Sequence, residues 1–427
     1  MGELFVRSRS YDNQLKSAAI SVEQSVESFQ SDEDWQTRIY QALNAFSPGA
    51  PIEGLERMAG RVTQIKKMLE VVAQRGQHAI LYGERGVGKS SLANALAAHL
   101  RNSICVHVNC HPCDDFSAVW RKVFRRLDDS GELLRRYPNR IDPDDVVVEL
   151  STGRRPPIII LDEFDKLTTD HVRSLIANTI KNLSDRSVAA TVLIVGVADS
   201  VNDLIEEHAS ILRCLRQISM ERMNLAELAE IIEKTCHQLG MAISPDALFR
   251  IVSISAGLPH YTHLLGQQAA RAALEAHTFS IAVEHIDKAV TECVAETAEI
   301  IKLQHRKAIR GGRKTSIFEQ VILAAALAAT DSGGCFAPAD LRRPLAELLG
   351  QDEASLSRYG YHLKLLCEDD YGRIFVRIGS KRKYRYRFIE PMMQPFVLMQ
   401  ALCDGVANWR QISTLGSGYW GLRFDKT

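Results

Sequence analysis

The chain has 427 residues, of which 46% are hydrophobic and 24% are charged, and its formal net charge is +0. This composition is typical of a soluble globular protein with two or three domains. A net charge of zero excludes any argument for nucleic-acid binding from overall charge, so such an argument has to come from local patches.

The cysteines and the first residues predict a cytoplasmic protein. Nine cysteines, an odd number, are spread loosely along the chain, as expected of reduced thiols rather than of a disulfide framework. The first ten residues contain no apolar segment of the kind that a secretion signal needs. The longest apolar runs are too short to cross a bilayer, so we expect no membrane partner.

Residues 1–50 are polar and acidic and predict an N-terminal arm. Within it, residues 35–46 favour one short amphipathic helix. A break rich in proline and glycine follows at residues 47–51. Residues 62–74 then predict a helix that leads to the first buried strand.

Residues 83–90 fit the pattern G-x-x-x-x-G-K-[ST] of the phosphate-binding loop, or P-loop. Residues 78–82 predict a strand before it and residues 91–100 a helix after it, an arrangement that aims a helix N-terminus at an anion. Lys89 reaches the β- and γ-phosphates in this motif and assists catalysis, and the Ser90 hydroxyl binds Mg²⁺. The predicted ATP-binding residues of this segment are Gly83, Glu84, Arg85, Gly86, Val87, Gly88, Lys89, Ser90 and Ser91.

A second apolar strand, residues 158–161, ends in two carboxylates, Asp162 and Glu163. This is the Walker B pattern, in which a buried strand carries an acid to the Mg²⁺ ion. We predict Asp162 as a Mg²⁺ ligand and Glu163 as the catalytic residue that polarises the attacking water. The alternative is a core strand with an exposed acidic end, and the P-loop upstream argues against it.

Further along, residues 189–196 form a third apolar run. Arg213 and Arg216 lie three residues apart, a spacing that places both on one side of a helix. Residues 224–307 are largely helical in pattern, with a helix end at Gly240 and an N-cap at Ser244. Residues 309–315 form a basic, glycine-containing linker.

The region after this linker predicts a winged helix, with helices at residues 316–330, 338–349 and 352–366 and two strands at residues 373–377 and 383–388. Residues 371–389 contain seven Arg or Lys and no Asp or Glu. Basic residues on a hairpin suit phosphate contact, and a third helix is the usual groove reader. The predicted contacts to duplex DNA are Arg358, Lys364, Arg377, Lys381, Arg382, Lys383, Arg385 and Arg387. A hairpin that packs on another protein is the alternative.

The order of P-loop, Walker B strand, helical segment and winged helix resembles the initiator branch of the AAA+ ATPases, which includes origin-recognition and replication-initiator proteins. The resemblance covers residues from about 55 to 395. Residues 257–260 are also similar to AAA+ ATPases that serve transposition or bacterial defence. The implied fold is an α/β AAA+ core, a parallel sheet with flanking helices, followed by an all-α lid and a C-terminal winged helix. The implied divisions are residues 1–50, 51–222, 223–308, 309–315, 316–396 and a tail, 397–427.

The resemblance also implies roles for five further residues. Asp199 and Ser200 hold the place of the residue that senses the γ-phosphate, and Ser200 suits it better because a carboxylate repels phosphate. Either Arg213 or Arg216 reaches the nucleotide of a neighbouring subunit, which implies a homo-oligomer. His260 holds the place of a sensor arginine in the lid, or has no nucleotide contact. Because the usual sensor asparagine and lid arginine are missing, hydrolysis is expected to be slow.

Three hypotheses of function result. The first is an ATPase that binds ATP and Mg²⁺ between core and lid and grips duplex DNA with its winged helix, with assembly set by the nucleotide. In the second, a regulatory ATPase of a defence or mobile-element system docks a partner effector protein through the winged helix. The third, a P-loop kinase of small molecules, predicts an acceptor pocket and needs no winged helix. The first two hypotheses are argued partly from fold.

Overall fold

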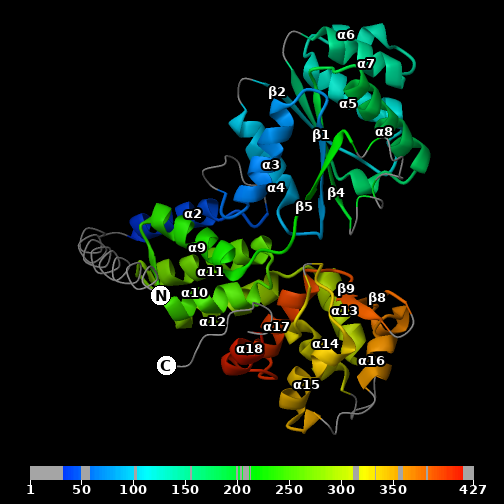
Figure 1. The fold of residues 1–427 in the computed structure, drawn as a ribbon. Helices are drawn as coiled ribbons and strands as arrows, with labels where there is room; N and C mark the ends of the chain where they lie inside the picture. The colour runs from blue at the N-terminus through cyan, green and yellow to red at the C-terminus, as the bar shows by residue number, and fades with distance from the viewer. Residues whose placement is uncertain are drawn as a thin grey trace, which may run out of the picture. The chain divides into compact units, whose positions relative to one another are not determined.

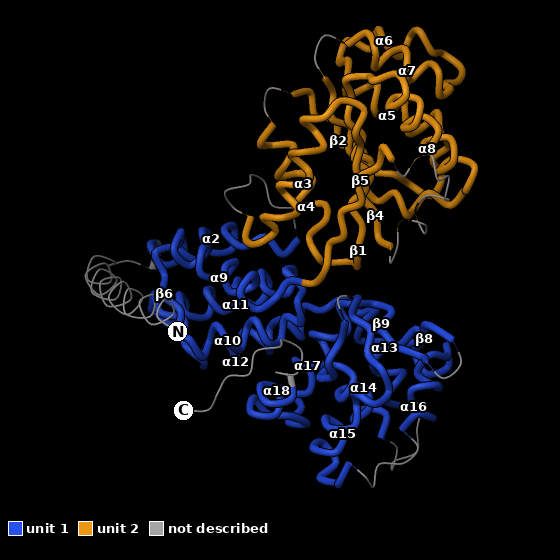
Figure 2. Tube along the Cα trace, in the orientation of Figure 1, with its two compact units in different colours: residues 1–49, 223–427 blue, residues 50–222 orange. Residues whose placement is uncertain are grey.

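A computed structural model describes residues 32–49, 58–100, 103–153, 156–198, 201, 204, 211, 213–310, 317–331, 333–353, 359–380 and 383–416. The chain forms two compact units, drawn in Figure 1 and coloured separately in Figure 2. We call residues 50–222 the core unit, and residues 1–49 together with 223–427 the helical unit.

A five-stranded parallel sheet in the order β2-β3-β4-β1-β5 is the centre of the core unit. Its strands are β1 (His78–Gly83), β2 (Ile104–Asn109), β3 (Pro157–Asp162), β4 (Thr191–Val197) and β5 (Leu215–Ser219). Every residue of β3 is buried, as expected of a strand covered on both faces. Since all the strands run the same way, the residues that follow β1 and β3 meet at one edge of the sheet.

Helices cover both faces of this sheet, with α3 and α4 on one side and α5–α8 on the other (Figure 1). They are α3 (Val62–Ala73), α4 (Lys89–His99), α5 (Phe116–Leu127), α6 (Glu132–Arg136), α7 (Pro143–Thr152) and α8 (Asp170–Asp185), with a 3₁₀ turn, η2 (Phe164–Lys166). Local sequence fixes several helix starts. The Asp115 carboxylate, for example, accepts a hydrogen bond from the Ala118 amide at 2.7 Å and begins α5.

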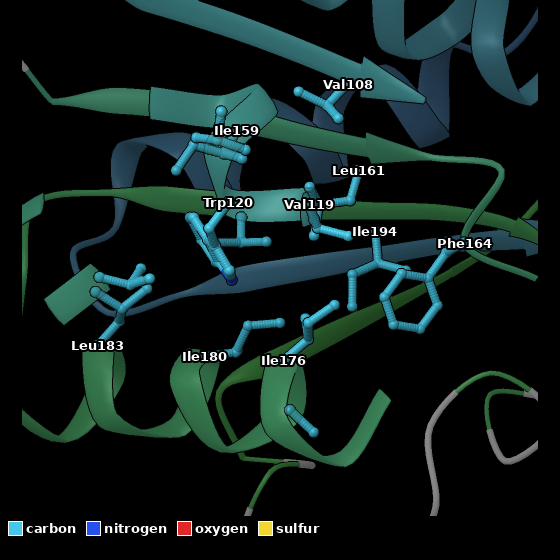
Figure 3. Close-up of a cluster of buried hydrophobic side chains, with 14 of the residues drawn as sticks. Val108, Val119, Trp120, Ile159, Leu161, Phe164, Ile176, Ile180, Leu183 and Ile194 are labelled. Atoms are coloured by element: carbon cyan, nitrogen blue, oxygen red, sulfur yellow. The ribbon is translucent and has the colours of Figure 1, made fainter. Parts of the chain in front are cut away.

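The face of the sheet under α5 and α8 carries a large apolar cluster (Figure 3). Trp120 and Phe124 of α5 are fully buried there, as is Phe164 directly after β3. Full burial of side chains of this size contributes roughly 1.5–3 kcal/mol each. The cluster therefore holds the end of β3, and with it Asp162, in a fixed position.

The first part of the helical unit is a helical bundle with one short parallel strand pair. Its elements are α2 (Asp32–Ala45), α9 (Leu225–Leu239), β6 (Ala242–Ile243), α10 (Pro245–Ile254), α11 (Pro259–Glu275), β7 (Ser280–Ile281) and α12 (Val283–Glu296). Helix α9 starts with a capping box between Asn224 and Glu227 and ends at Gly240, whose φ is 66°. Helix α2 packs on α11, where a Cβ at Gly266 would lie 2.5 Å from the Phe46 ring.

The second part of the helical unit has helices on both sides of a β-hairpin in the sequence. Its elements are α13 (Glu299–Arg310), α14 (Phe318–Leu327), η4 (Pro338–Leu341), α15 (Arg342–Leu349), α16 (Tyr359–Leu365), η6 (Asp369–Tyr371), β8 (Phe375–Ile378), β9 (Arg385–Phe388), α17 (Met393–Cys403) and α18 (Trp409–Gly416). The expected domain end between residues 396 and 397 falls inside α17, whose Phe396 and Val397 are both buried. Among the described residues, no helix is both long enough and apolar enough to cross a membrane.

The prediction of one helix carrying Arg213 and Arg216 is wrong. Arg216 lies in β5, which pairs with β1 from Leu215 opposite His78 to Ser219 opposite Tyr82, and Arg213 lies in the turn before this strand. Leu215 and Ile218 are buried while Arg216 and Gln217 are exposed. Pairing with β1 gives this segment main-chain hydrogen bonds and buries two of its side chains. These interactions favour a strand although the spacing of the arginines suits a helix.

Candidate nucleotide-binding site

The P-loop joins the end of β1 to the start of α4, as its flanking residues predicted. Gly86 and Gly88 have φ angles of 86° and 92°, in the left-handed region that favours glycine. Lys89, Ser90 and Ser91 form the first turn of α4, where main-chain amides have no partner within the helix. A helix N-terminus at the end of a glycine loop is a ready anion site.

The side chain of Lys89 is folded into this loop. Its Nζ donates to the carbonyl oxygens of Gly83 at 3.0 Å and Glu84 at 2.6 Å. Burial lowers the pKa of Lys89 to about 8, although the charges of Asp165, Asp162 and Glu84 act in the opposite direction. Only 8% of the residue is exposed, so its ammonium lies where the loop encloses it.

Asp162 lies at the end of β3, beside the P-loop helix. Its Oδ2 is 3.1 Å from His107 Nε2 and its Oδ1 accepts from the Glu163 amide at 2.8 Å, and the nearby Ser90 hydroxyl also favours the charged form. Burial raises the pKa of Asp162, but these hydrogen bonds together outweigh burial and the pKa lies below its usual range. The side chain is therefore a carboxylate.

Glu163 follows in an unusual backbone conformation, with φ at 55°. A non-glycine residue in this region stores strain of order 1–3 kcal/mol, and such residues cluster at functional sites. Its side chain is partly exposed, and Oε1 lies 2.7 Å from Lys166 Nζ. The carboxylate is thus at the same edge of the sheet as Lys89 and is open to solvent.

These residues fit a magnesium-bound nucleoside triphosphate. A carboxylate and a hydroxyl, those of Asp162 and Ser90, lie close together, and oxygen ligands are those that Mg²⁺ prefers. The enclosed ammonium of Lys89 is at hydrogen-bond distance from two main-chain carbonyls of the loop, and a phosphate oxygen is a stronger partner for it. The donor set therefore suits phosphate and Mg²⁺ together.

Sequence reasoning missed two residues at this edge. His107 of β2 contacts Asp162 and, through Nδ1, the side chain of Asn94 on α4 at 2.6 Å, so it links the P-loop helix to the Walker B acid. Asp165 accepts from the Val197 amide at 2.8 Å and ties η2 to the end of β4. A polar residue on an otherwise apolar strand was the available signal for His107, and Asp165 follows Asp162 by three residues.

Two other missed residues, Arg61 and Arg222, are buried against the P-loop. Arg61 donates to the carbonyl oxygen of Val87 at 3.0 Å. Arg222 Nε lies 2.8 Å from Glu84 Oε2. Their sequence separation from the loop leaves no local pattern by which they could have been found.

The remaining predicted nucleotide residues lie elsewhere or outside the described residues. Asp199 and Ser200 are outside the described part of the chain. Arg213 and Arg216 are exposed beside β5 and pair with Asp185 and Glu70. His260 is the second residue of α11, and its Nδ1 is 2.7 Å from the carbonyl oxygen of Pro48 in the same unit. Burial lowers the pKa of His260, which this hydrogen bond partly offsets.

The hairpin residues divide between its two faces. The pairing of Val376 with Arg387 and of Ile378 with Arg385 places both arginines on one face. Arg377 lies on the other face, with its guanidinium 4.4 Å from the centre of the Tyr384 ring.

Among the other predicted DNA contacts, Lys364 and Lys383 are exposed. Arg358, Lys381 and Arg382 lie outside the described residues. Arg385 also donates to the Cys335 carbonyl oxygen at 2.8 Å and lies 3.3 Å from Asp331, an acid outside the hairpin that sequence reasoning did not consider.

A protein-family model described as an AAA domain matches residues 72–205, which include the P-loop and the Walker B strand. These residues form an AAA domain. The prediction of an AAA+ fold for the core, a parallel sheet with flanking helices, is therefore confirmed. The sheet, the P-loop and the Walker B carboxylates of this AAA domain are those described above.

Solved structures similar to this chain include three archaeal proteins. Cdc6p from Pyrobaculum aerophilum is 16% identical, with 85% of this chain and 98% of that chain covered and a TM-score of 0.46. ORC2 from Aeropyrum pernix, in ADPNP–ADP complexes, is 15% identical with 87% and 98% covered and a TM-score of 0.49.

ORC1 from Aeropyrum pernix, in complex with DNA, is 16% identical with 80% and 93% covered and a TM-score of 0.44. No curated protein matches the sequence. These identities and TM-scores are too low for a function to be carried over to this chain.

Proposed function

We propose that this protein is an ATP-binding and ATP-hydrolysing AAA+ protein of the origin-recognition and replication-initiator branch, and that it acts in the cytoplasm. One observation carries the proposal. The Lys89 ammonium is enclosed by the P-loop at the sheet edge where Ser90 and the Asp162 carboxylate lie close together. This is the set of groups that a Mg²⁺-nucleotide requires.

Each residue has a role set by its position. The amides of residues 85–91 and the Lys89 ammonium bind phosphate oxygens, while Ser90 and Asp162 hold the metal. Bound Mg²⁺ neutralises negative charge on the phosphates. The Glu163 carboxylate first separates from Lys166. One of its Oε atoms then accepts a hydrogen bond from the attacking water and polarises it.

The arginines beside β5 support action on a neighbouring chain. Leu215 pairs with His78, at the start of β1, whereas the P-loop follows the end of β1. At about 3.3 Å per residue, the length of β5 separates Arg213 from the P-loop of its own chain. An exposed arginine placed in this way can complete the site of a second copy, which makes assembly depend on the nucleotide.

The C-terminal helices and hairpin are proposed to be a winged helix that binds duplex DNA by its phosphates. Arg385 and Arg387 share one face of the hairpin, and Lys364 and Lys383 are exposed nearby in the sequence. Cations on an exposed face favour backbone contact rather than base readout. The order of parts, AAA core then helical bundle then winged helix, supports the initiator branch.

A second candidate function is a regulatory AAA+ ATPase whose winged helix docks an effector protein. The pairing of Arg385 with Asp331 favours it, because this acid reduces the positive charge that the hairpin offers to a phosphate. Tyr361 on α16 is also 62% exposed, as an aromatic anchor for a protein partner would be. Binding that persists at high salt would support this candidate over DNA.

The test of the leading proposal is to measure ATP hydrolysis and molecular mass, with and without Mg²⁺-ATP, on the same preparation. We expect Mg²⁺-dependent release of phosphate and a larger particle with ATP than without it. Adding a 30-base-pair duplex at low salt should give a complex that dissociates as salt rises. Absence of Mg²⁺-dependent phosphate release would overturn the proposal, and absence of DNA binding would overturn only its second half.

A further inference from the structure

Two buried arginines connect the P-loop to residues 220–222, the last residues of the core unit. The chain passes from the core unit to the helical unit between Arg222 and Met223. The residues of this segment precede α9 and follow β5 directly. No step of the proposed hydrolysis uses either arginine, so their burial against the loop calls for another explanation.

The first connection is an ion pair between Arg222 and Glu84. Arg222 Nε lies 2.8 Å from Glu84 Oε2, and the side chain of each residue is only 7% exposed. Glu84 is a variable position of the P-loop pattern, so phosphate binding does not by itself require a glutamate there. The pair joins the second residue of the loop to the last residue of the unit, across 138 positions of sequence.

The second connection is Arg61, which is 3% exposed and precedes α3. Its Nη2 donates to the carbonyl oxygen of Val87 in the loop at 3.0 Å and to that of Glu221 at 2.7 Å. The same guanidinium therefore joins the loop to residues 220–222. Its backbone has a φ of 61°, a conformation that a non-glycine residue keeps only when its surroundings impose it.

Direct main-chain contact completes the connection. The Met220 amide donates to the Tyr82 carbonyl at 2.8 Å, and a Cβ at Gly83 would lie 2.3 Å from the Met220 carbonyl oxygen. The loop therefore contacts residues 220–222 at three places: at Gly83 through Met220, at Glu84 through Arg222, and at Val87 through Arg61. A conformational change in the loop must therefore either move residues 220–222 or break these hydrogen bonds.

Glu84 is the residue where nucleotide binding would act. Its main-chain carbonyl accepts from Lys89, and its side chain accepts from Arg222. When Lys89 turns to a phosphate, the carbonyl of Glu84 loses that hydrogen bond. The residue that Arg222 holds is therefore one whose main-chain bonding differs between the free and the occupied loop.

The ion pair is poorly suited to stabilising the fold. Taking two charges out of water costs several kcal/mol per ion, and the attraction offsets this only if the remaining atoms are also paired. Within the described part of the chain, Oε1 of Glu84 is buried and receives no hydrogen bond. A pair with this arrangement is better explained by conformational specificity than by stability.

We propose that Arg61 and Arg222 are positioning residues that couple the P-loop to residues 220–222, so that occupation of the loop by a nucleoside triphosphate changes the conformation of the segment leading to the helical unit. The inference rests on the proposed nucleotide-binding function. It adds to that function the route by which the site influences the chain beyond it.

The test is amide hydrogen exchange of the peptide covering residues 218–224, measured in the full chain with and without saturating Mg²⁺-ATP. In the wild type we expect exchange in this peptide to change by at least about fivefold, the low end of ordinary coupling between sites. The variant Arg222→Met removes the guanidinium of the ion pair and changes no residue of the P-loop. It should still bind ATP, as measured by calorimetry, and lose the change in exchange.

A matched control is Glu149→Gln/Arg136→Met, which removes another ion pair of the core unit, one in which Arg136 is largely exposed. It should respond to ATP as the wild type does. Arg61→Met leaves Glu84 and Arg222 paired and tests the second connection, and it should reduce the response.

The outcomes separate the two claims. If the wild type binds ATP and the peptide does not respond, the coupling is overturned while the nucleotide site stands. The same conclusion holds if the Arg222→Met variant binds ATP and responds in full. If the wild type binds no ATP, the proposed function fails and the coupling fails with it.

Discussion

The two regions that carry charge in this protein differ in how their charges are held. At the P-loop, Lys89, Glu84 and Asp162 are each less than 10% exposed and are fixed by named partners. On the hairpin, Arg377, Lys383 and Arg385 are exposed. A buried charge needs a specific partner, whereas an exposed one acts mainly through its field, which salt screens.

This difference decides how far each region can be interpreted. The buried set is chemically suited to a triphosphate with a metal, because it pairs an enclosed ammonium with oxygen ligands. The exposed set specifies only a negatively charged surface. Substitutions at the P-loop should therefore have large effects that salt does not change, and substitutions on the hairpin should have smaller effects that depend on salt.

The largest effect is expected at Arg213 and Arg216, which are exposed but are proposed to act on a buried site in a second copy. Replacing the active one, Arg213 or Arg216, by Ala should lower hydrolysis by about 10³-fold or more, the usual effect of removing an arginine finger. Mixing this variant with a Lys89→Ala variant should restore part of the activity, because intact sites form between the two. No recovery on mixing would mean that neither arginine acts in trans.

Glu163→Gln should lower the rate of ATP hydrolysis by about 10²–10⁴-fold, the contribution of a positioned general base. Its ATP affinity, measured by calorimetry, should be unchanged, because the carboxamide keeps the size of the side chain. Glu132→Gln on α6 is the matched control and should hydrolyse ATP at the wild-type rate. A Glu163→Gln protein with full activity would remove Glu163 from the site.

Lys89→Ala should weaken ATP binding by about a hundredfold or more, because each charge-assisted hydrogen bond contributes about 1.5–3 kcal/mol. Raising the salt concentration should not erase the difference from the wild type. Lys181→Ala, on α8 of the same unit, should bind ATP as the wild type does. Equal affinity in the Lys89 and Lys181 variants would contradict the assignment of the P-loop.

Arg385→Ala/Arg387→Ala should weaken duplex binding at low salt and flatten its dependence on salt. Loss of two phosphate contacts lowers the slope of log K against log salt by about 1.8. The ATP affinity of the variant should not change. Lys234→Ala/Arg271→Ala removes two cations of the helical unit away from the hairpin and should leave the slope as it was; if the two double variants give the same slope, the hairpin does not contact DNA.

The smallest expected effect is on the stability of the fold, and it comes from His78, a buried titratable residue outside the proposed nucleotide site. His78 is fully buried, its Nδ1 accepts from the Val192 amide at 3.0 Å, and burial lowers its pKa to about 4. Because the folded pKa lies below the unfolded value, the stability from neutral His78 is present above about pH 6.5 and is lost as pH falls toward 4.

From pH 7.5 to pH 5 this loss should be about 2 kcal/mol of unfolding free energy. His78→Asn keeps an acceptor near the position of Nδ1 and does not titrate. Urea unfolding at both pH values should therefore give a smaller pH dependence for the variant. An unchanged pH dependence would mean that His78 is not the group responsible.

Local sequence was enough to predict the elements around the P-loop and the Walker B strand. The predicted strand at residues 78–82 is β1, the one ending at Asp162 is β3, and the helix predicted to end at Gly240 is α9. In each case the apolar run and the residues that end it are adjacent in the chain. Strand β5 was not predicted, because a short edge strand that contains polar residues has no clear sequence pattern of its own.

The supporting residues of the site could not be predicted for a related reason. His107 reaches Asp162 across 55 positions, and Arg222 reaches Glu84 across 138. Such contacts depend on the order of strands in the sheet and on where the chain leaves the unit. A motif names the residues that touch a ligand, but it does not name the residues that hold them in place.

The most direct test of the account is a structure of this protein with Mg²⁺ and a non-hydrolysable ATP analogue. We predict that the β- and γ-phosphates lie against the amides of residues 86–90, that Lys89 has turned to them from Glu84, and that Ser90 and Asp162 lie at the metal. Triphosphate bound elsewhere, or a saturated crystal in which this loop holds no phosphate, would contradict it.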